Sequence, residues 1–117
     1  MVKPKSLGHV VLRVRELARA ESFYTKILSL DVQAKIDDKM VFLTSNTESS
    51  HELALLEIGR DAPGPNPDGV GLYHTAWRYS SLEELRKLHK TLIENSIESG
   101  IGTVSYTHLT LPTILLV

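Results

Sequence analysis

The chain has 117 residues, of which 42% are hydrophobic and 23% charged, and its formal net charge at pH 7 is -1. This composition is typical of one modest globular core, the near-zero charge offers no basic surface for a nucleic acid, and the absence of cysteine excludes disulfides and thiolate metal sites. Because no apolar run is long enough to span a membrane and no signal peptide is recognisable, we expect a cytoplasmic protein without a membrane or nucleic-acid partner.

Residues 1–58 carry the strand and helix signals of one βαβββ module. Leu7–Val14 is apolar and β-branched, which predicts a strand. An amphipathic helix follows, whose predicted apolar stripe is Ala20, Phe23, Tyr24, Ile27 and Leu28. Three further strands are predicted, with a turn at residues 37–39 and a polar loop at 45–50: Asp31–Ile36, Met40–Thr44 and His51–Ile58.

A linker and the start of a second module come next. Residues 59–71 hold three of the five prolines and four of the seven glycines, which predicts a linker. Residues 72–102 then give a strand, Leu72–Tyr79, and a helix that begins with a capping box of Ser81 and Glu84. The expected stripe of this helix is Leu82, Leu85, Leu88 and Leu92.

The two modules match when the chain is shifted by 65 residues. His9 then falls on His74, and Arg13 falls on Arg78. The helix stripe continues in the same register, with Ala20, Phe23, Ile27 and Leu28 on Leu85, Leu88, Leu92 and Ile93. We interpret the pattern as an internal duplication, so that the two histidines occupy equivalent positions.

Strand alternation assigns faces to these histidines. His9, Val11 and Arg13 share one face of the first strand, whereas the aliphatic residues between them should pack under the helix. His9 is therefore expected on the concave side of the sheet, and His74 on the equivalent side of its own strand. Two such imidazoles can meet at one divalent metal ion.

A third histidine, His51, opens the last strand of the first module. By alternation it shares a face with Leu53, Leu55 and Glu57. Near a metal its imidazole would be suited to moving protons. The residues leave an alternative open, in which His51 is an exposed residue at the end of the polar loop.

The sequence resembles the vicinal oxygen chelate superfamily, which contains glyoxalases, bleomycin resistance proteins and extradiol dioxygenases. The resemblance rests on LGHVVLRVREL, FYTKIL, HELALLEIG and GLYHTAWRYSSLEELRKL, and covers Leu7 to about Gly102. It implies an α+β fold of βαβββ modules, of the glyoxalase/extradiol dioxygenase type, in which two modules form a cup around a divalent metal. We expect the second module to be truncated in this chain.

The resemblance is greatest to the extradiol-dioxygenase-like branch. It implies that His9 and His74 are metal ligands and that His51 is the catalytic acid/base residue. Glyoxalase I would require a carboxylate at the position of Leu53, and Glu52 points to the other face by alternation. The implied cofactor is iron(II), with manganese, zinc or nickel as alternatives, and the implied substrate is a small catechol-like or other vicinal-oxygen compound.

Two alternatives remain beside a ring-cleaving dioxygenase. One is a lyase or isomerase of the glyoxalase type. The other is a non-catalytic ligand-binding protein of the bleomycin-resistance kind, which would use a dimeric cup without a metal. In any of these forms a homodimer is compatible with the resemblance.

The end of the chain departs from the family pattern. No motif of the type DPDGNGIELY, whose glutamate would be the third metal ligand, follows Gly102. Residues 104–113 can instead be encoded by a nucleotide string that resembles a transposase-end sequencing adapter, so we predict that residues 103–117 are a non-native tail. The alternative is a genuine short β segment. With the third carboxylate ligand absent, we expect weak metal binding and low activity from the chain as it stands.

Overall fold

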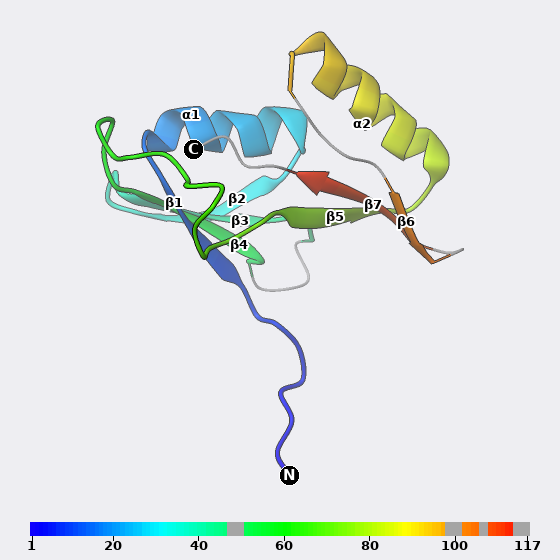
Figure 1. Cartoon of the computed structure of the whole chain (residues 1–117), viewed down its shortest axis with the longest axis horizontal. Helices are drawn as coiled ribbons and strands as arrows, with labels where there is room; N and C mark the ends of the chain where they lie inside the picture. Colours follow the sequence, from blue (N-terminus) through cyan, green and yellow to red (C-terminus); the bar gives the residue numbers. More distant parts are fainter. Residues whose placement is uncertain (47–50, 98–101, 106–107, 114–117) are drawn as a thin grey trace. The chain divides into compact units, whose positions relative to one another are not determined.

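The computed structural model describes residues 1–46, 51–97, 102–105 and 108–113, with side chains described as far as Ile97 (Figure 1). Contacts between Cα atoms divide the chain into two compact units, Met1–Gly64 and Pro65–Leu116. The division falls inside the segment for which the sequence predicts a linker. Each unit is described by itself.

Unit 1 is a four-stranded sheet with one helical segment. Its elements in chain order are β1 (Val10–Val14), α1 (Leu17–Ser22), η1 (Phe23–Ile27), β2 (Asp31–Ile36), β3 (Met40–Thr44) and β4 (Leu53–Glu57). The sheet order is β1-β4-β3-β2. The outer strand β1 is parallel to β4, whereas β4–β3 and β3–β2 are antiparallel pairs. The predicted α+β fold with a βαβββ module is confirmed.

The core of unit 1 lies between the sheet and α1–η1. In β1, Leu12 and Val14 are buried, while Val11 and Arg13, which alternate with them, are exposed, as the alternation predicts. The helical segment packs over β3 and β4, which run through the middle of the sheet. Other buried hydrophobic side chains of this core are Leu17, Ala20, Tyr24, Leu28, Val41, Leu43, Leu53 and Leu55.

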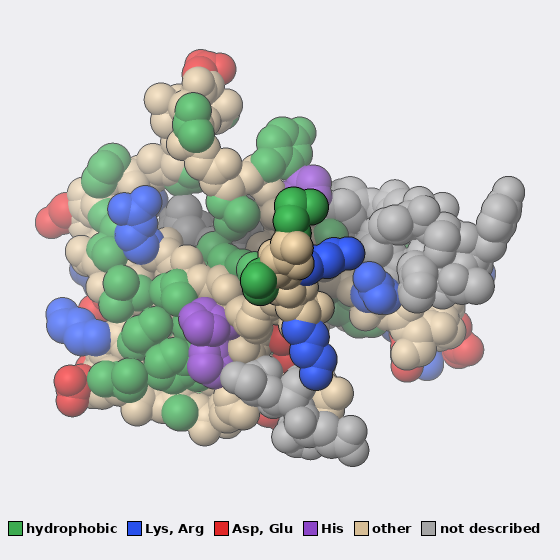
Figure 2. Space-filling view, turned by 90° about the horizontal axis from the view of Figure 1, so that it is seen from below, with side chains coloured by type: hydrophobic (Ala, Val, Ile, Leu, Met, Phe, Trp, Pro, Cys, Tyr) green, Lys and Arg blue, Asp and Glu red, His purple; other side chains and the backbone are tan. Residues whose placement is uncertain are grey.

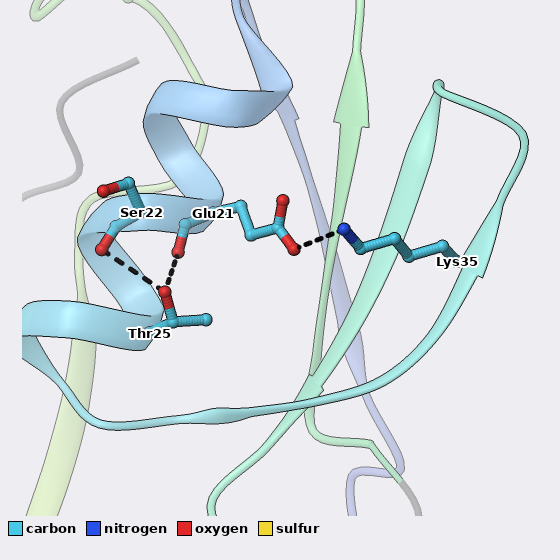
Figure 3. A network of polar contacts seen from close by, with 4 residues as sticks. All are labelled: Glu21, Ser22, Thr25 and Lys35. Carbon is cyan, nitrogen blue, oxygen red and sulfur yellow. Dashed lines mark hydrogen bonds and ion pairs between the residues drawn. The ribbon is translucent and has the colours of Figure 1, made fainter.

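A π-helical turn alters the predicted helix stripe. The helix changes from α to π geometry at Phe23, and Thr25 Oγ1 donates to the carbonyl oxygen of Glu21 at 2.8 Å (Figure 3). A π turn contains an extra residue. The buried positions after Ala20 are therefore Tyr24 and Leu28, each one residue later than Phe23 and Ile27. Tyr24 is therefore fully buried, whereas Phe23 and Ile27, expected on the stripe, are only half-buried.

Polar contacts connect this helix to the sheet. The carboxylate of Glu21 forms an ion pair with the ammonium of Lys35 on β2 at 2.9 Å, as Figure 3 shows. At the other end, Glu16 precedes the helix and makes no side-chain cap bond. Glu57, at the end of β4, accepts a hydrogen bond from the backbone N–H of Leu17 at 2.8 Å in its place.

Unit 2 repeats the first two elements of unit 1. It contains β5 (Thr75–Tyr79) and α2 (Leu82–Glu94), which begin at the positions that a shift of 65 residues from Val10 and Leu17 gives. Ser81 caps α2, because its Oγ accepts a hydrogen bond from Glu84 N at 3.2 Å, as the capping box predicts. The buried residues of α2 are Leu85, Leu88 and Leu92.

Two positions of the predicted stripe differ from the structure. Leu82 is 48% exposed and Ile93 is 62% exposed. Leu82 is the first residue of the helix, and Ile93 follows the buried Leu92 and so lies about 100° further round the helix axis. The apolar face of α2 is consequently narrower than the sequence suggests.

After α2 the two units are organised differently. Strands β6 (Gly102–Ser105) and β7 (His108–Thr113) form a sheet of order β5-β7-β6, in which β7 is antiparallel to β5. In unit 1 the strand next to β1 is parallel to it. The middle strand of this sheet, β7, contains Pro112, which pairs with Ala76 of β5. Proline has no N–H to donate to a neighbouring strand. The adapter origin of this segment stays a prediction.

Candidate active site

Two imidazoles meet at one edge of the sheet in unit 1. His9 immediately precedes β1, and His51 lies two residues before β4. The parallel register pairs Val10 with Leu53, so the two strands begin side by side. As a result the ring centroids of His9 and His51 are 4.6 Å apart, with an angle of 42° between the ring planes. We call these residues the imidazole pair.

The imidazole pair borders an apolar surface on the side of the sheet away from α1. Phe42 of β3 lies against His51, with ring centroids 4.6 Å apart. Phe42 pairs with Ala54 of β4, which pairs with Val11 of β1, so these three side chains share a face. Figure 2 shows adjacent histidine side chains bordered by hydrophobic ones. An apolar ligand placed on this face would lie beside both imidazoles.

The contact with Phe42 corrects one expectation from the sequence. Strand alternation places His51 on the same face as Leu53 and Leu55, which are buried under the helix. The structure places its ring against His9 and Phe42, on the opposite face. Alternation does not extend to His51 because β4 begins only at Leu53.

The two imidazoles differ in their surroundings. The side chain of His9 is exposed, whereas Nε2 of His51 is buried and has no hydrogen-bond partner among the described residues. A buried polar atom without a partner costs about 1–3 kcal/mol, so such atoms often belong to functional sites. Nε2 of His51 is the atom of this pair whose hydrogen-bonding capacity the described residues leave unused.

Glu52 holds the segment next to the imidazole pair, a role that the sequence analysis missed. Its carboxylate accepts hydrogen bonds from Ser45 N at 3.2 Å, from Ser45 Oγ at 2.5 Å and from Thr44 Oγ1 at 2.9 Å. Its carbonyl oxygen accepts one from Val10 N at 3.0 Å. The β3–β4 register of the structure, continued by one step, places Thr44 opposite Glu52, which explains why the two side chains meet.

His74 lies in unit 2, immediately before β5. Its side chain is exposed and its ring makes an edge contact with Tyr73, with centroids 5.1 Å apart. Ala76 and Arg78 are also exposed on this strand, while Thr75, Trp77 and Tyr79 are half-buried, which is the alternation seen in β1. The meeting of His74 and His9 at one metal stays a prediction.

The donors of unit 1 fit part of a metal site. Imidazole is a common ligand of divalent first-row metals, and His9 is exposed for such a role. In the part of the chain that the structure describes, no group of three or more histidine, aspartate or glutamate side chains lies close enough to hold an ion. Glu52 is occupied by the bonds to β3, and Leu53 is buried and apolar. A complete site therefore needs donors from beyond this set.

Comparison with known proteins gives one family and two related structures. The family model described as the Glyoxalase/Bleomycin resistance protein/Dioxygenase superfamily matches residues 6–111. A structure of a possible glyoxalase from Bacillus cereus is 18% identical, with a TM-score of 0.57 over 83% of this chain and 80% of that chain. A lactoylglutathione lyase from Agrobacterium tumefaciens is 20% identical, with a TM-score of 0.60 over 85% of this chain and 77% of its own.

At these identities the two structures are similar to this chain in fold. No curated protein matches the chain. Among the described residues, no helix is both long and apolar enough to cross a membrane.

Proposed function

The chain belongs to the Glyoxalase/Bleomycin resistance protein/Dioxygenase superfamily, and on this premise we propose that it is a metal-dependent enzyme of the extradiol-dioxygenase kind. In this proposal His9 and His74 are metal ligands and His51 is the catalytic acid/base residue. Iron(II) is the proposed metal, with manganese, zinc or nickel as alternatives. The substrate class is a catechol-like or other vicinal-oxygen compound.

The observation that carries the proposal is the contact between His51 and His9. A group that transfers protons must lie within hydrogen-bond reach of the reacting molecule, and therefore close to the ion that holds that molecule. The ring of His51 lies 4.6 Å from that of His9, and its Nε2 is buried without a partner among the described residues. This arrangement supports a ligand at His9 and a proton carrier at His51.

The surroundings of β4 favour a dioxygenase over a glyoxalase. A glyoxalase I-like site would take a carboxylate from this strand as a metal ligand. The carboxylate nearest the imidazole pair in sequence, Glu52, is bonded to Thr44 and Ser45, and the next residue is a buried leucine. Neither Glu52 nor Leu53 is thus suited to the role of a glyoxalase-type metal ligand. The proposed metal donor of unit 1 is therefore a histidine.

The chemistry of the site follows from its residues. An aromatic ring can pack on the accessible side chains of Val11 and Phe42, beneath which Ala54 is fully buried, with its hydroxyl groups directed to the imidazole pair. His51 can then accept a hydroxyl proton at Nε2 and return it as the ring opens. A bound divalent metal would orient the reactants and stabilise developing negative charge.

Other parts of the proposal concern assembly and location. The donors described here do not complete a three-ligand site, so we propose that a second copy of the chain contributes to the cup in a homodimer. We also propose a cytoplasmic location, which agrees with a composition that has no cysteine.

The test is oxygen-dependent cleavage of catechol by the full chain. The chain is loaded with iron(II) under argon, catechol and oxygen are added, and oxygen uptake and the absorbance of the ring-opened product are followed. We expect slow cleavage, abolished in His51→Gln and kept in the control His89→Gln, whose histidine lies on α2. Isomerisation of a thiohemiacetal without oxygen uptake would instead indicate a glyoxalase-type enzyme. Ligand binding that is indifferent to metal and to His9→Ala would indicate a binding protein.

A further inference from the structure

Glu52 is the point at which three strands of unit 1 meet beside the imidazole pair. Its carbonyl oxygen accepts a hydrogen bond from Val10 N, in the residue that follows His9. Its carboxylate accepts hydrogen bonds from Thr44 and Ser45 at the end of β3. One residue thus connects β1 and β3 at the place where the chain enters β4.

The hydrogen bonds of the Glu52 carboxylate continue the connection between β3 and β4 beyond their last backbone pair. The last β3–β4 pair is Leu43 with Leu53. Beyond it, the carboxylate of Glu52 binds the side chain of Thr44, which is buried, and the backbone N–H of Ser45. Thr44 Oγ1 has a single proton, which it can donate to Glu52 Oε1 or to the carbonyl oxygen of Asn46, while Asn46 N donates to Oγ1.

His51 lies next to this connection in the chain. His51 precedes Glu52 and lies outside β4, so it takes no part in the strand pairing of the described residues. Its ring is nevertheless held between those of His9 and Phe42, at 4.6 Å from each. Charge-assisted hydrogen bonds are stronger than neutral ones, and those at the neighbouring residue restrict the backbone from which His51 projects.

We propose that Glu52 is a positioning residue that holds the His51 imidazole against His9 and Phe42. It does so through the bonds of its carboxylate to Thr44 and Ser45. The role rests on the proposed function of His51 as the acid/base residue, and it assigns no contact between Glu52 and the substrate or metal.

The test measures the accessibility of His51 in the full chain, without metal or turnover. Diethylpyrocarbonate modifies unprotonated imidazoles, and mass spectrometry of peptides gives separate rates for His9, His51 and His89. In the parent chain we expect His9 to react quickly and His51 slowly, because Nε2 of His51 is buried. In Glu52→Ala we expect His51 to react about tenfold faster, because local opening exposes it.

Matched variants separate positioning from general stability. Glu57→Ala removes a carboxylate at the other end of β4 that caps α1, so it should lower the unfolding temperature without raising the rate at His51. Glu52→Gln keeps one carbonyl acceptor and should give a rate between those of the parent and Glu52→Ala. A rate at His51 that is unchanged in Glu52→Ala, or raised equally in Glu57→Ala, would overturn the proposal.

The outcome is separable from that of the proposed function. If His51 becomes reactive in Glu52→Ala while the parent chain cleaves no catechol, the positioning role stands and the enzymatic proposal fails. If the parent is active, Glu52→Ala should lower kcat more than it changes KM, because His51 takes part in the reaction rather than in ground-state binding.

Discussion

The carboxylate of Glu57 accepts a hydrogen bond from the backbone N–H of Leu17 at 2.8 Å, so the end of β4 caps the start of α1. The residue that precedes the helix, Glu16, makes no such bond with its own side chain, and its carboxylate pairs with Arg60 at 2.9 Å instead. The βα connection of unit 1 is therefore closed by a residue 40 positions further along the chain.

Replacing Glu57 should destabilise unit 1. Loss of a helix-capping acceptor costs about 1 kcal/mol, so we expect Glu57→Ala to lower the free energy of unfolding by roughly that amount. Urea denaturation followed by circular dichroism measures it. The control is Asp61→Asn, at an exposed turn position, which should change the free energy little. An equal loss in both variants would contradict the capping role.

Tyr24 should make the stability of the protein sensitive to alkaline pH. Burial raises the pKa of its phenol well above the ordinary value of 10.0. Because the folded pKa exceeds the unfolded one, the neutral phenol contributes its full stability below pH 10.0 and loses it as the pH rises beyond that value. The free energy of unfolding should therefore fall with increasing pH above this point.

Tyr24→Phe is the variant that tests this expectation. The Tyr24 hydroxyl is buried and has no hydrogen-bond partner among the described residues, so its removal should stabilise unit 1 by about 1 kcal/mol at neutral pH. The alkaline loss should also become smaller. Tyr73→Phe, at a side chain that is 87% exposed, is the control and should retain the parent pH profile. Identical profiles for Tyr24→Phe and the parent would refute the assignment.

The strands after α2 give a prediction about the gene. Unit 2 has the same first strand and helix as unit 1, but its next paired strand, β7, is antiparallel to β5. This strand is the middle one of its sheet and contains Pro112. We predict that sequencing the source DNA through codons 102–114 will show a different continuation, with a glutamate codon in a later strand. Recovery of the same codons from the source DNA would contradict the adapter origin.

Local patterns in the sequence predict the elements of both units well. The strand and helix starts recur at a shift of 65 residues because the same alternation and helix signals recur there. Ser81 and Glu84 predict the cap of α2 because the capping box is a local motif. The faces of Val11 and Leu12 follow from alternation within a regular strand.

The rest of the site depends on contacts between distant residues. The closeness of His9 and His51 results from the parallel pairing of β1 with β4, which no local pattern encodes. Alternation gives the wrong face for His51 because that residue lies outside the strand. The π turn at Phe23–Ile27 leaves Phe23 and Ile27 only half-buried, while Tyr24 and Leu28 of the same predicted stripe are buried, since one extra residue changes the phase of the helix.

The central claim is that His9 is a metal ligand. Its most direct test is a calorimetric titration of the full chain with cobalt(II) in place of iron(II). The account predicts measurable binding by the parent, weakened about tenfold or more in His9→Ala by the loss of an imidazole ligand. Binding should be unchanged in the control His89→Ala, whose histidine lies on α2. Equal affinities for the parent and His9→Ala would contradict the assignment of His9 as a metal ligand.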